Sequence, residues 1–274
     1  MKPRTIVLAL VVAGFLVVGC DGRYGRLTGS GILVERELAY TDFESIWIAL
    51  GGNLTIVPST GYGITLRADD NLIDLVTVYP DDGGRTLVFA LDRNYYYRQA
   101  SIDIEVRMPV LRSLSSSIRY YPYPYYDDGP QVLVNAGFAD LDAVTISARD
   151  GSLEIESLDC ARFELDCRID DAVGVVSCDE ADMDLTGDGL RLSGSATSLS
   201  LSASSAHNID LSELVVSVAE VDIANGSTVE VNVSDTLSGT VDAESELTYS
   251  ELHTPDIADL QIEAEPVDEG VGTE

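Results

Sequence analysis

The sequence predicts an all-β fold: a single-chain β-solenoid, similar to a parallel β-helix, with short strands in coils of about 16–23 residues. Helical periodicity is nearly absent after residue 19, and short alternating apolar segments are separated by Gly, Asn, Asp or Pro. From residue 111 onward, apolar pairs recur in steps of 19, 20, 16, 17 and 23 residues, with second members Ile146, Leu165, Leu185, Leu201, Val218 and Val241. A β-sandwich is the alternative, but it would show less regular spacing and larger inward-facing residues.

Residues 1–19 have the layout of a secretory signal. Lys2 and Arg4 form a basic start, and Ile6–Val18 is an uninterrupted run of apolar residues and glycine. This run is shorter than the roughly 20 residues of a membrane-spanning helix. The end of the run, residues 17–20 (VVGC), resembles a bacterial lipobox, which predicts cleavage before Cys20 and lipidation of its sulfur. Two or more acyl chains would hold the chain on a membrane durably. An ordinary signal peptide, or an N-terminal anchor, with an incidental cysteine is the alternative.

The exported chain is strongly acidic. Without residues 1–19 it has 14 basic and 47 acidic residues and a net charge of −33. Such a surface repels phosphate backbones, which excludes nucleic acid as a partner. Solvation of the surface, adaptation to a saline habitat and cation binding are three interpretations that the charge leaves open. The sequence indicates no cofactor.

The mature chain divides into four parts by composition and periodicity. Residues 20–30 form a linker after the lipidated cysteine, and residues 31–110 form an N-terminal β part with alternating segments such as Ile46–Ile48. Residues 111–254 contain the solenoid repeats, interrupted by a Tyr- and Pro-rich insertion at 119–130. Residues 255–274 form an acidic C-terminal tail.

Several motifs resemble a bacterial family described as "putative auto-transporter adhesin, head GIN domain", a domain of unknown function. They are Phe43 with Ile46, the run Asp69-Asp70-Asn71-Leu72, the Ser/Gly-rich segment 190–214 and a closing Tyr249. The resemblance covers residues 29–255. The chain departs from the family where Gly-Ser-Gly repeats are replaced by other small residues, and at the insertion. The resemblance implies a β-solenoid and brings no catalytic or binding residues with it.

Two tyrosine-rich stretches are the candidate ligand contacts. Tyrosine offers flat apolar area and a hydroxyl at a low cost in rotamer entropy, so recognition surfaces use it often. Pro122 and Pro124 favour an extended loop for the second stretch. Tyrosines that fold back over an open end of the solenoid are the alternative. The candidate residues are Tyr95, Tyr96, Tyr97, Tyr120, Tyr121, Tyr123, Tyr125 and Tyr126.

Cys160 and Cys178 are separated along the chain by close to the length of one coil. We therefore expect them on adjacent rungs, about 4.8 Å apart, where a disulfide is geometrically possible. Free buried thiols are the alternative, and Cys167 is the odd cysteine in either case. Without a Cys-x-x-Cys motif, zinc or thiol-redox chemistry has no support.

Enzyme and metal motifs are missing from the sequence. It contains no Gly-x-Ser-x-Gly, His-Glu-x-x-His or phosphate-binding loop, and segment 179–189 lacks the ordered ligands and closing glutamate of a calcium loop. We expect His207 and His253 to be structural or surface residues. Paired catalytic carboxylates cannot be recognised among so many acidic residues.

These observations favour a non-catalytic protein that is exported and lipid-anchored to the bacterial cell envelope, with the inner or outer membrane undetermined. Its partners would be the membrane, through Cys20, and a polysaccharide or surface protein. A carbohydrate-active β-helix lyase or hydrolase is one alternative, and a purely structural envelope component is another. The sequence leaves the oligomeric state open.

Overall fold

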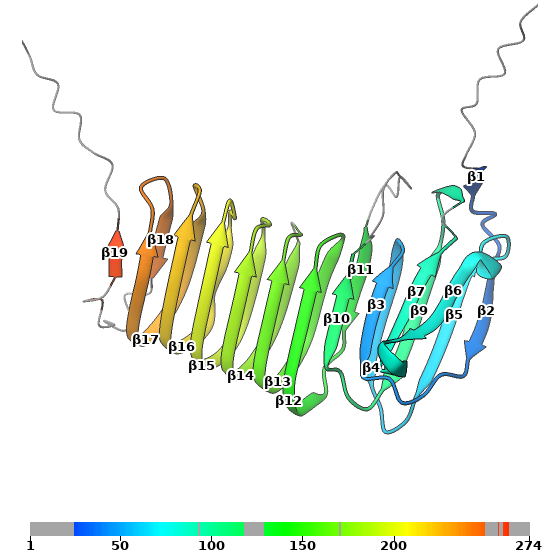
Figure 1. Cartoon of the computed structure of the whole chain (residues 1–274), viewed down its shortest axis with the longest axis horizontal. Helices are drawn as coiled ribbons and strands as arrows, with labels where there is room; N and C mark the ends of the chain where they lie inside the picture. The colour runs from blue at the N-terminus through cyan, green and yellow to red at the C-terminus, as the bar shows by residue number, and fades with distance from the viewer. Residues whose placement is uncertain are drawn as a thin grey trace, which may run out of the picture.

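The computed structural model describes residues 25–92, 94–117, 129–169, 171–249, 257 and 260–262. The chain forms a β-solenoid of about six turns, which confirms the fold class that the sequence predicts (Figure 1). In the longest strands, such as β13 (Ser152–Cys167), the alternation of buried and exposed residues is interrupted where the strand bends. Each coil therefore consists of three short segments. The first, second and third segments of successive coils stack into three sheets, which we call faces 1, 2 and 3.

Face 1 has the first segments of the long strands, and face 3 has the last segments. Face 1 begins with strands of the N-terminal part of the chain and ends with a short strand near the C-terminus. Face 3 is built in the same way. Face 1 contains, in spatial order, β2 (Leu33–Leu38), β5 (Gly63–Asp69), β9 (Ile102–Met108), β4 (Gly52–Pro58), β11 (Pro130–Val134), the starts of β13 to β17, and β18 (Glu246–Tyr249). Face 3 contains β6 (Val76–Asp81), β7 (Thr86–Leu91), β3 (Ser45–Ala49), β10 (Ser113–Ser116), β12 (Phe138–Ala148), the ends of β13, β14 (Ala172–Leu185), β15 (Leu190–Ser204), β16 (Ile209–Ala224) and β17 (Thr228–Val241), and then β19 (Leu260–Ile262).

The core is a set of inward-facing columns that run along the solenoid axis. One column is formed, coil by coil, by Ile146, Leu165, Met183, Leu201, Val221 and Gly239, which lie opposite one another in register. The steps between these sequence positions differ little, so the coils are more regular in length than the sequence predicts. The sequence prediction was wrong at three positions, because Leu185, Val218 and Val241 are not the equivalents of Ile146.

Antiparallel strands cover the N-terminal end of the stack. Strand β2 pairs antiparallel with β5, which pairs antiparallel with β9, and β6 pairs antiparallel with β7. Two short 3-10 helices, η1 (Ile73–Leu75) and η2 (Asp82–Gly84), connect these strands. A separate parallel ribbon of β1 (Gly25–Thr28) and β8 (Tyr95–Arg98) lies beside this end (Figure 1).

The Asp-Asp-Asn-Leu motif holds the segment between β1 and β2. Asp69 is fully buried, and its two carboxylate oxygens accept hydrogen bonds from the backbone N–H groups of Gly31 (2.7 Å) and Ser101 (2.8 Å). The Asn71 amide donates to the carbonyl of Thr28 at 2.9 Å. A buried carboxylate that accepts two backbone hydrogen bonds is strongly stabilising compared with a side chain that leaves those donors unpaired. The motif therefore fastens the start of the folded chain to the N-terminal end of the solenoid.

We expect the substitution Asp69→Asn to lower the free energy of unfolding by about 2–3 kcal/mol, because an amide nitrogen would then face a backbone N–H donor. The matched substitution Asp70→Asn changes an exposed carboxylate that accepts from the Ser30 hydroxyl, so it should cost less than about 1 kcal/mol. Urea unfolding followed by far-ultraviolet circular dichroism measures both values. Equal losses in the two variants would contradict the role given to Asp69.

A polar groove on face 1 and the predicted site residues

A groove of about 630 Å³ lies on the outer side of face 1, near the N-terminal end of the solenoid. Six strands that are far apart in sequence form its floor: β2, β5, β9, β4, β11 and β13. Since side chains alternate across a strand, each of these strands turns every second residue outward into the groove. The apolar neighbours Leu54, Ile104 and Val132 face the core and are buried.

Strand register arranges the outward side chains in two rows across the groove. The first row is Glu35, Arg67, Asp103, Asn53, Gln131 and Ser152. The second row is Thr65, Glu105, Thr55, Leu133 and Glu154, and Glu37 follows Thr65 in register outside the groove lining. Neighbouring members of a row are separated by one strand spacing, about 4.8 Å. The rows therefore offer closely spaced hydrogen-bond donors and acceptors along a line perpendicular to the strands.

Few of the donors in the groove are used by other described residues. The Asn53 amide donates to the Asp103 carboxylate at 2.7 Å, and the Thr65 hydroxyl donates to the Glu37 carboxylate at 3.0 Å. Arg67 is exposed and lies in register between Glu35 and Asp103, but it forms no ion pair with any described residue. Its guanidinium is available to a ligand that enters the groove.

A smaller hollow of about 380 Å³ continues the groove toward the β1–β8 ribbon. It shares Asn53, Asp103 and Gln131 with the larger groove and is also lined by Tyr97 and Gly129. Gly129 is the first described residue at the C-terminal end of the Tyr- and Pro-rich insertion. The structure thus brings one predicted tyrosine stretch and the point where the insertion rejoins the solenoid to the same hollow.

The tyrosines of β8 differ in their exposure. Tyr97 is only 2% exposed, its hydroxyl donates to the carbonyl of Asp92 at 2.7 Å, and burial raises the pKa of this phenol. Its ring is part of the core, which leaves little of it for a ligand. Tyr95 and Tyr96 are half-buried, and the ring of Tyr95 lies over Gly25, where a Cβ atom would be only 2.8 Å from the ring.

The other predicted sites fall partly outside the described residues. Cys20 and the tyrosines of the insertion (Tyr120, Tyr121, Tyr123, Tyr125 and Tyr126) lie outside them, so their roles stay predictions. Cys160 and Cys178 lie directly opposite each other on face 2, as their spacing predicts, but both thiols are free in the structure. Burial raises the pKa of Cys160 to about 12 and that of Cys178 to about 11. The thiolate needed for disulfide formation is therefore scarce at neutral pH, and the disulfide stays a prediction.

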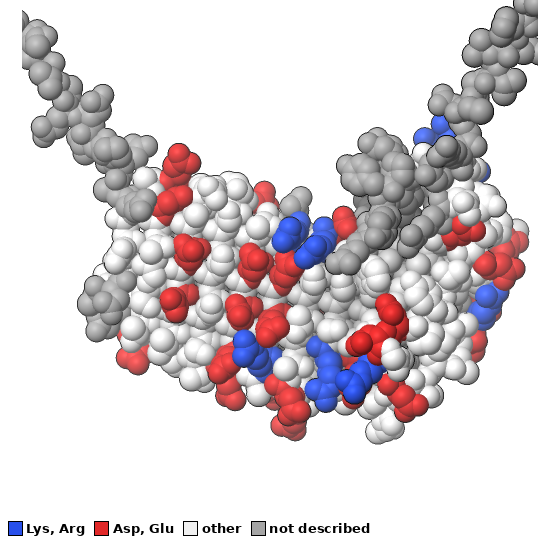
Figure 2. All heavy atoms as spheres, viewed as in Figure 1, with Lys and Arg blue, Asp and Glu red and all other residues white. Residues whose placement is uncertain are grey.

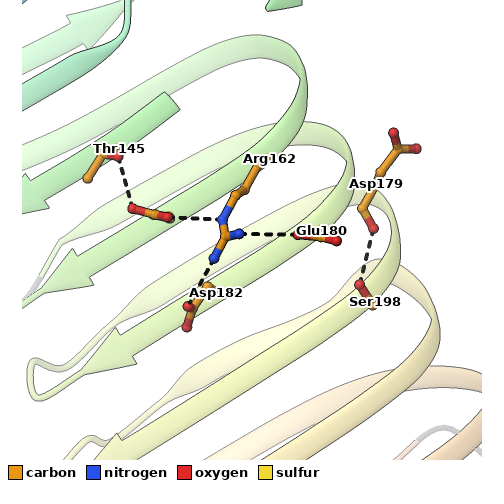
Figure 3. Close-up of polar contacts among 7 residues, drawn as sticks. Thr145, Arg162, Asp179, Glu180, Asp182 and Ser198 are labelled. Atoms are coloured by element: carbon orange, nitrogen blue, oxygen red, sulfur yellow. Dashed lines mark hydrogen bonds and ion pairs between the residues drawn. The ribbon is translucent and has the colours of Figure 1, made fainter. Parts of the chain in front are cut away.

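Face 3 has carboxylates on its outer side, in register from coil to coil (Figure 2). Glu164 and Asp182 are directly opposite, and like charges in that arrangement repel. Arg162 relieves this repulsion, because it contacts Glu164 at 3.0 Å, Glu180 at 3.4 Å and Asp182 at 3.9 Å. Figure 3 shows Arg162 with Glu180 and Asp182.

Arginines also compensate the negative charge of Asp166. Its partial burial raises the pKa of the carboxyl, but hydrogen bonds and charges from Arg149 and Arg168 outweigh burial and hold the pKa below its ordinary value. The few arginines of face 3 thus compensate charge that in-register stacking concentrates.

Within the described residues, no group of three His, Cys, Asp or Glu side chains is arranged to hold a metal ion. His207 Nδ1 contacts the Asp188 carboxylate at 2.9 Å on an exposed turn, while His253 lies outside the described residues. No helix in the described part of the chain is long and apolar enough to cross a membrane.

Comparisons with known proteins find one family model that matches part of the solenoid. Residues 126–251 match the model of a family described as "Putative auto-transporter adhesin, head GIN domain". The match covers the solenoid repeats but not the Phe43 and Asp69–Leu72 motifs on which the sequence resemblance also rests. No curated protein matches the chain.

Three solved structures share the fold over both parts of the chain. A putative lipid binding protein from Parabacteroides distasonis is 17% identical, with a TM-score of 0.69, over 87% of this chain and 96% of that one. A putative adhesin from Parabacteroides merdae is 12% identical, with a TM-score of 0.68, over 88% of this chain and 100% of that one. A putative adhesin from Bacteroides fragilis is 18% identical, with a TM-score of 0.60, over 87% of this chain and 96% of that one. At these identities the likeness establishes the fold alone.

We expect Arg162→Gln to lower the free energy of unfolding by roughly 1 kcal/mol at low salt, because three half-exposed carboxylates lose their shared partner. The loss should fade toward 1 M NaCl, where charges are screened within about 3 Å. Arg191→Gln is the matched control, since Arg191 pairs with one carboxylate, Asp210 at 3.0 Å, and should lose less than about 0.5 kcal/mol. Urea unfolding at two salt concentrations tests this, and a loss that does not depend on salt would contradict it.

Proposed function

We propose that the chain, whose residues 126–251 match the model of the "Putative auto-transporter adhesin, head GIN domain" family, is a non-catalytic binding protein of the bacterial cell envelope. The polar groove on face 1 is its binding site. The observation that carries this proposal is the pair of outward rows across six strands, from Glu35 to Ser152 and from Thr65 to Glu154.

The chemistry of the groove favours a polysaccharide over a lipid. Its side chains supply amides, hydroxyls, carboxylates and the guanidinium of Arg67, which has no ion-pair partner among the described residues. This mixture matches sugar hydroxyls, which both donate and accept hydrogen bonds. One solved neighbour is titled a putative lipid binding protein, but an acyl chain needs an apolar lining. In this groove the apolar residues Leu54, Ile104 and Val132 point into the core, and Leu133 is the one apolar side chain among the outward rows of described residues. A surface protein is the other partner that such a polar groove could hold.

Lipidation of Cys20 would attach this binding protein to the membrane. The lipobox-like residues 17–20 support it, and Gly25, the first residue of β1, follows Cys20 by only five residues. The tyrosines of the insertion are further proposed contacts, since Gly129 at its end lines the smaller hollow.

Intact-mass analysis of the chain extracted from bacterial membranes tests the anchor. We expect a product that begins at Cys20 and carries acyl chains, with no residues of 1–19 left. A product that retains residues 1–19, or that has an unmodified Cys20, would contradict lipid anchoring without bearing on the groove.

We expect the double substitution Asn53→Ala and Gln131→Ala to weaken binding to a responsive envelope polysaccharide about tenfold or more, because each amide contributes about 1 kcal/mol in hydrogen bonds. A glycan array followed by calorimetry measures the affinity. The control Ser238→Ala with Thr240→Ala removes two hydroxyls from the outer side of face 3 and should leave the affinity unchanged. Equal loss in both variants would contradict the groove.

A turnover assay on the same polysaccharide separates binding from catalysis. The groove contains the carboxylates of Glu35, Asp103, Glu105 and Glu154, so a carbohydrate-active enzyme is the second candidate. We expect no release of soluble fragments. Fragment release that Asp103→Asn abolishes, with the fold intact, would replace the non-catalytic proposal by an enzymatic one.

A further inference from the structure

The β1–β8 ribbon has a composition unlike the rest of this acidic chain. Its eight residues, Gly25–Thr28 and Tyr95–Arg98, contain two arginines and no carboxylate, although the mature chain has a net charge of −33. Arg26 and Arg98 are exposed and form no ion pair with any described residue. Figure 2 shows blue atoms at the end of the molecule where Figure 1 places β1. Tyr96 is half-buried and lies directly opposite Arg26, on the same side of the ribbon as Arg98, whereas Tyr95 alternates to the other side with the buried Tyr97.

The ribbon is also the described part of the chain nearest to Cys20 in sequence. Gly25 is the fifth residue after Cys20, so five residue steps of a fully extended chain place the sulfur-bearing residue no more than about 18 Å from β1. The ribbon is fastened to the solenoid as well. The Asn71 amide, which lies outside the ribbon, donates to the Thr28 carbonyl at 2.9 Å. Within the ribbon, Gly25 N–H donates to the Asn94 carbonyl at 2.9 Å and Gly29 N–H donates to the Arg98 carbonyl at 3.1 Å.

We propose that the outer side of the β1–β8 ribbon lies against the phospholipid headgroups of the membrane that carries the anchor. Guanidinium groups bind headgroup phosphates in bidentate geometry, and tyrosine is enriched at membrane interfaces, where its ring and its hydroxyl find different surroundings. The acidic coils are repelled by an anionic leaflet, so they favour the orientation in which the ribbon faces the lipid. This inference rests on the lipid anchoring proposed above.

Quenching by brominated phospholipids tests the orientation on vesicles that contain anionic lipid. The full mature chain is attached through Cys20, with a tryptophan reporter placed in the ribbon by Tyr96→Trp and, in a second variant, on the last coil by Thr240→Trp. Both variants have Trp47→Phe, which removes the native tryptophan. We expect the reporter at position 96 to be quenched several-fold more strongly than the one at position 240. Equal quenching at the two positions would overturn the proposal.

The arginines give a second measurement on the same vesicles. Arg26→Gln and Arg98→Gln should each shift the balance of orientations about fivefold away from the ribbon-down state, since one basic side chain near an anionic surface contributes about that factor. The control Arg191→Gln lies far along the solenoid on β15 and should leave quenching unchanged. Unchanged quenching in both ribbon variants would assign the orientation to the tether alone and overturn the proposal.

The orientation of the ribbon can be tested even if the proposed lipidation of Cys20 is wrong. If the native chain has no acyl chains, the same mature chain can be coupled through Cys20 to a maleimide lipid in the vesicle. Cys160 and Cys167 are buried, and burial raises the pKa of Cys178 to about 11, so Cys20 is the thiol that reacts. The orientation result then holds whether or not bacteria lipidate the chain.

Discussion

In-register stacking of successive coils is the constraint on which the rest of the molecule depends. Each side chain has the equivalent side chain of the next coil as its neighbour at about 4.8 Å. This arrangement stabilises apolar residues, since the members of columns such as Ile146, Leu165 and Met183 bury one another. Carboxylates do not, and the outer side of face 3 remains stable through arginines such as Arg162 and through hydroxyls, Ser200 among them, that interrupt the acidic columns. Close stacking of the coils also requires a glycine at position 239, because a Cβ atom there would lie 1.8 Å from the carbonyl oxygen of Val221.

The strands at the two ends of the stack must also be protected, since an unpaired strand edge can pair with another chain. At the N-terminal end, β2, β5 and β9 continue face 1 with antiparallel partners. This change of direction has two consequences. It brings six strands from distant parts of the sequence side by side, and their outward residues form the groove. It also leaves the β1–β8 ribbon beside the same end, so the groove and the segment nearest to Cys20 are close together.

The solenoid could be predicted from the sequence because its signal is local. Alternation within a strand and a recurring coil length identify the inward columns, and a spacing of one coil correctly places Cys160 opposite Cys178. The sequence wrongly predicted Leu185 and Val218 as the equivalents of Ile146. The apolar alternation continues for several residues at both places, so spacing alone does not identify the residue that stacks on the Ile146 column. The groove could not be predicted, since Glu35, Arg67, Asp103 and Asn53 meet only through the register of the N-terminal strands. Tyr97 was predicted as a ligand contact from its residue type alone. Its burial and its hydrogen bond to a backbone carbonyl make it part of the core instead.

The distance along one outward column tests the stacking most directly. Thr145, Glu164, Asp182, Ser200, Glu220 and Ser238 follow one another in register, so five strand spacings separate the first residue from the last. Spin labels at positions 145 and 238, measured by double electron–electron resonance, should give a narrow distribution near roughly 24 Å between the backbones, and labels at 145 and 220 should be about 5 Å closer. Distances that do not increase by one strand spacing per coil would contradict a stack of in-register coils.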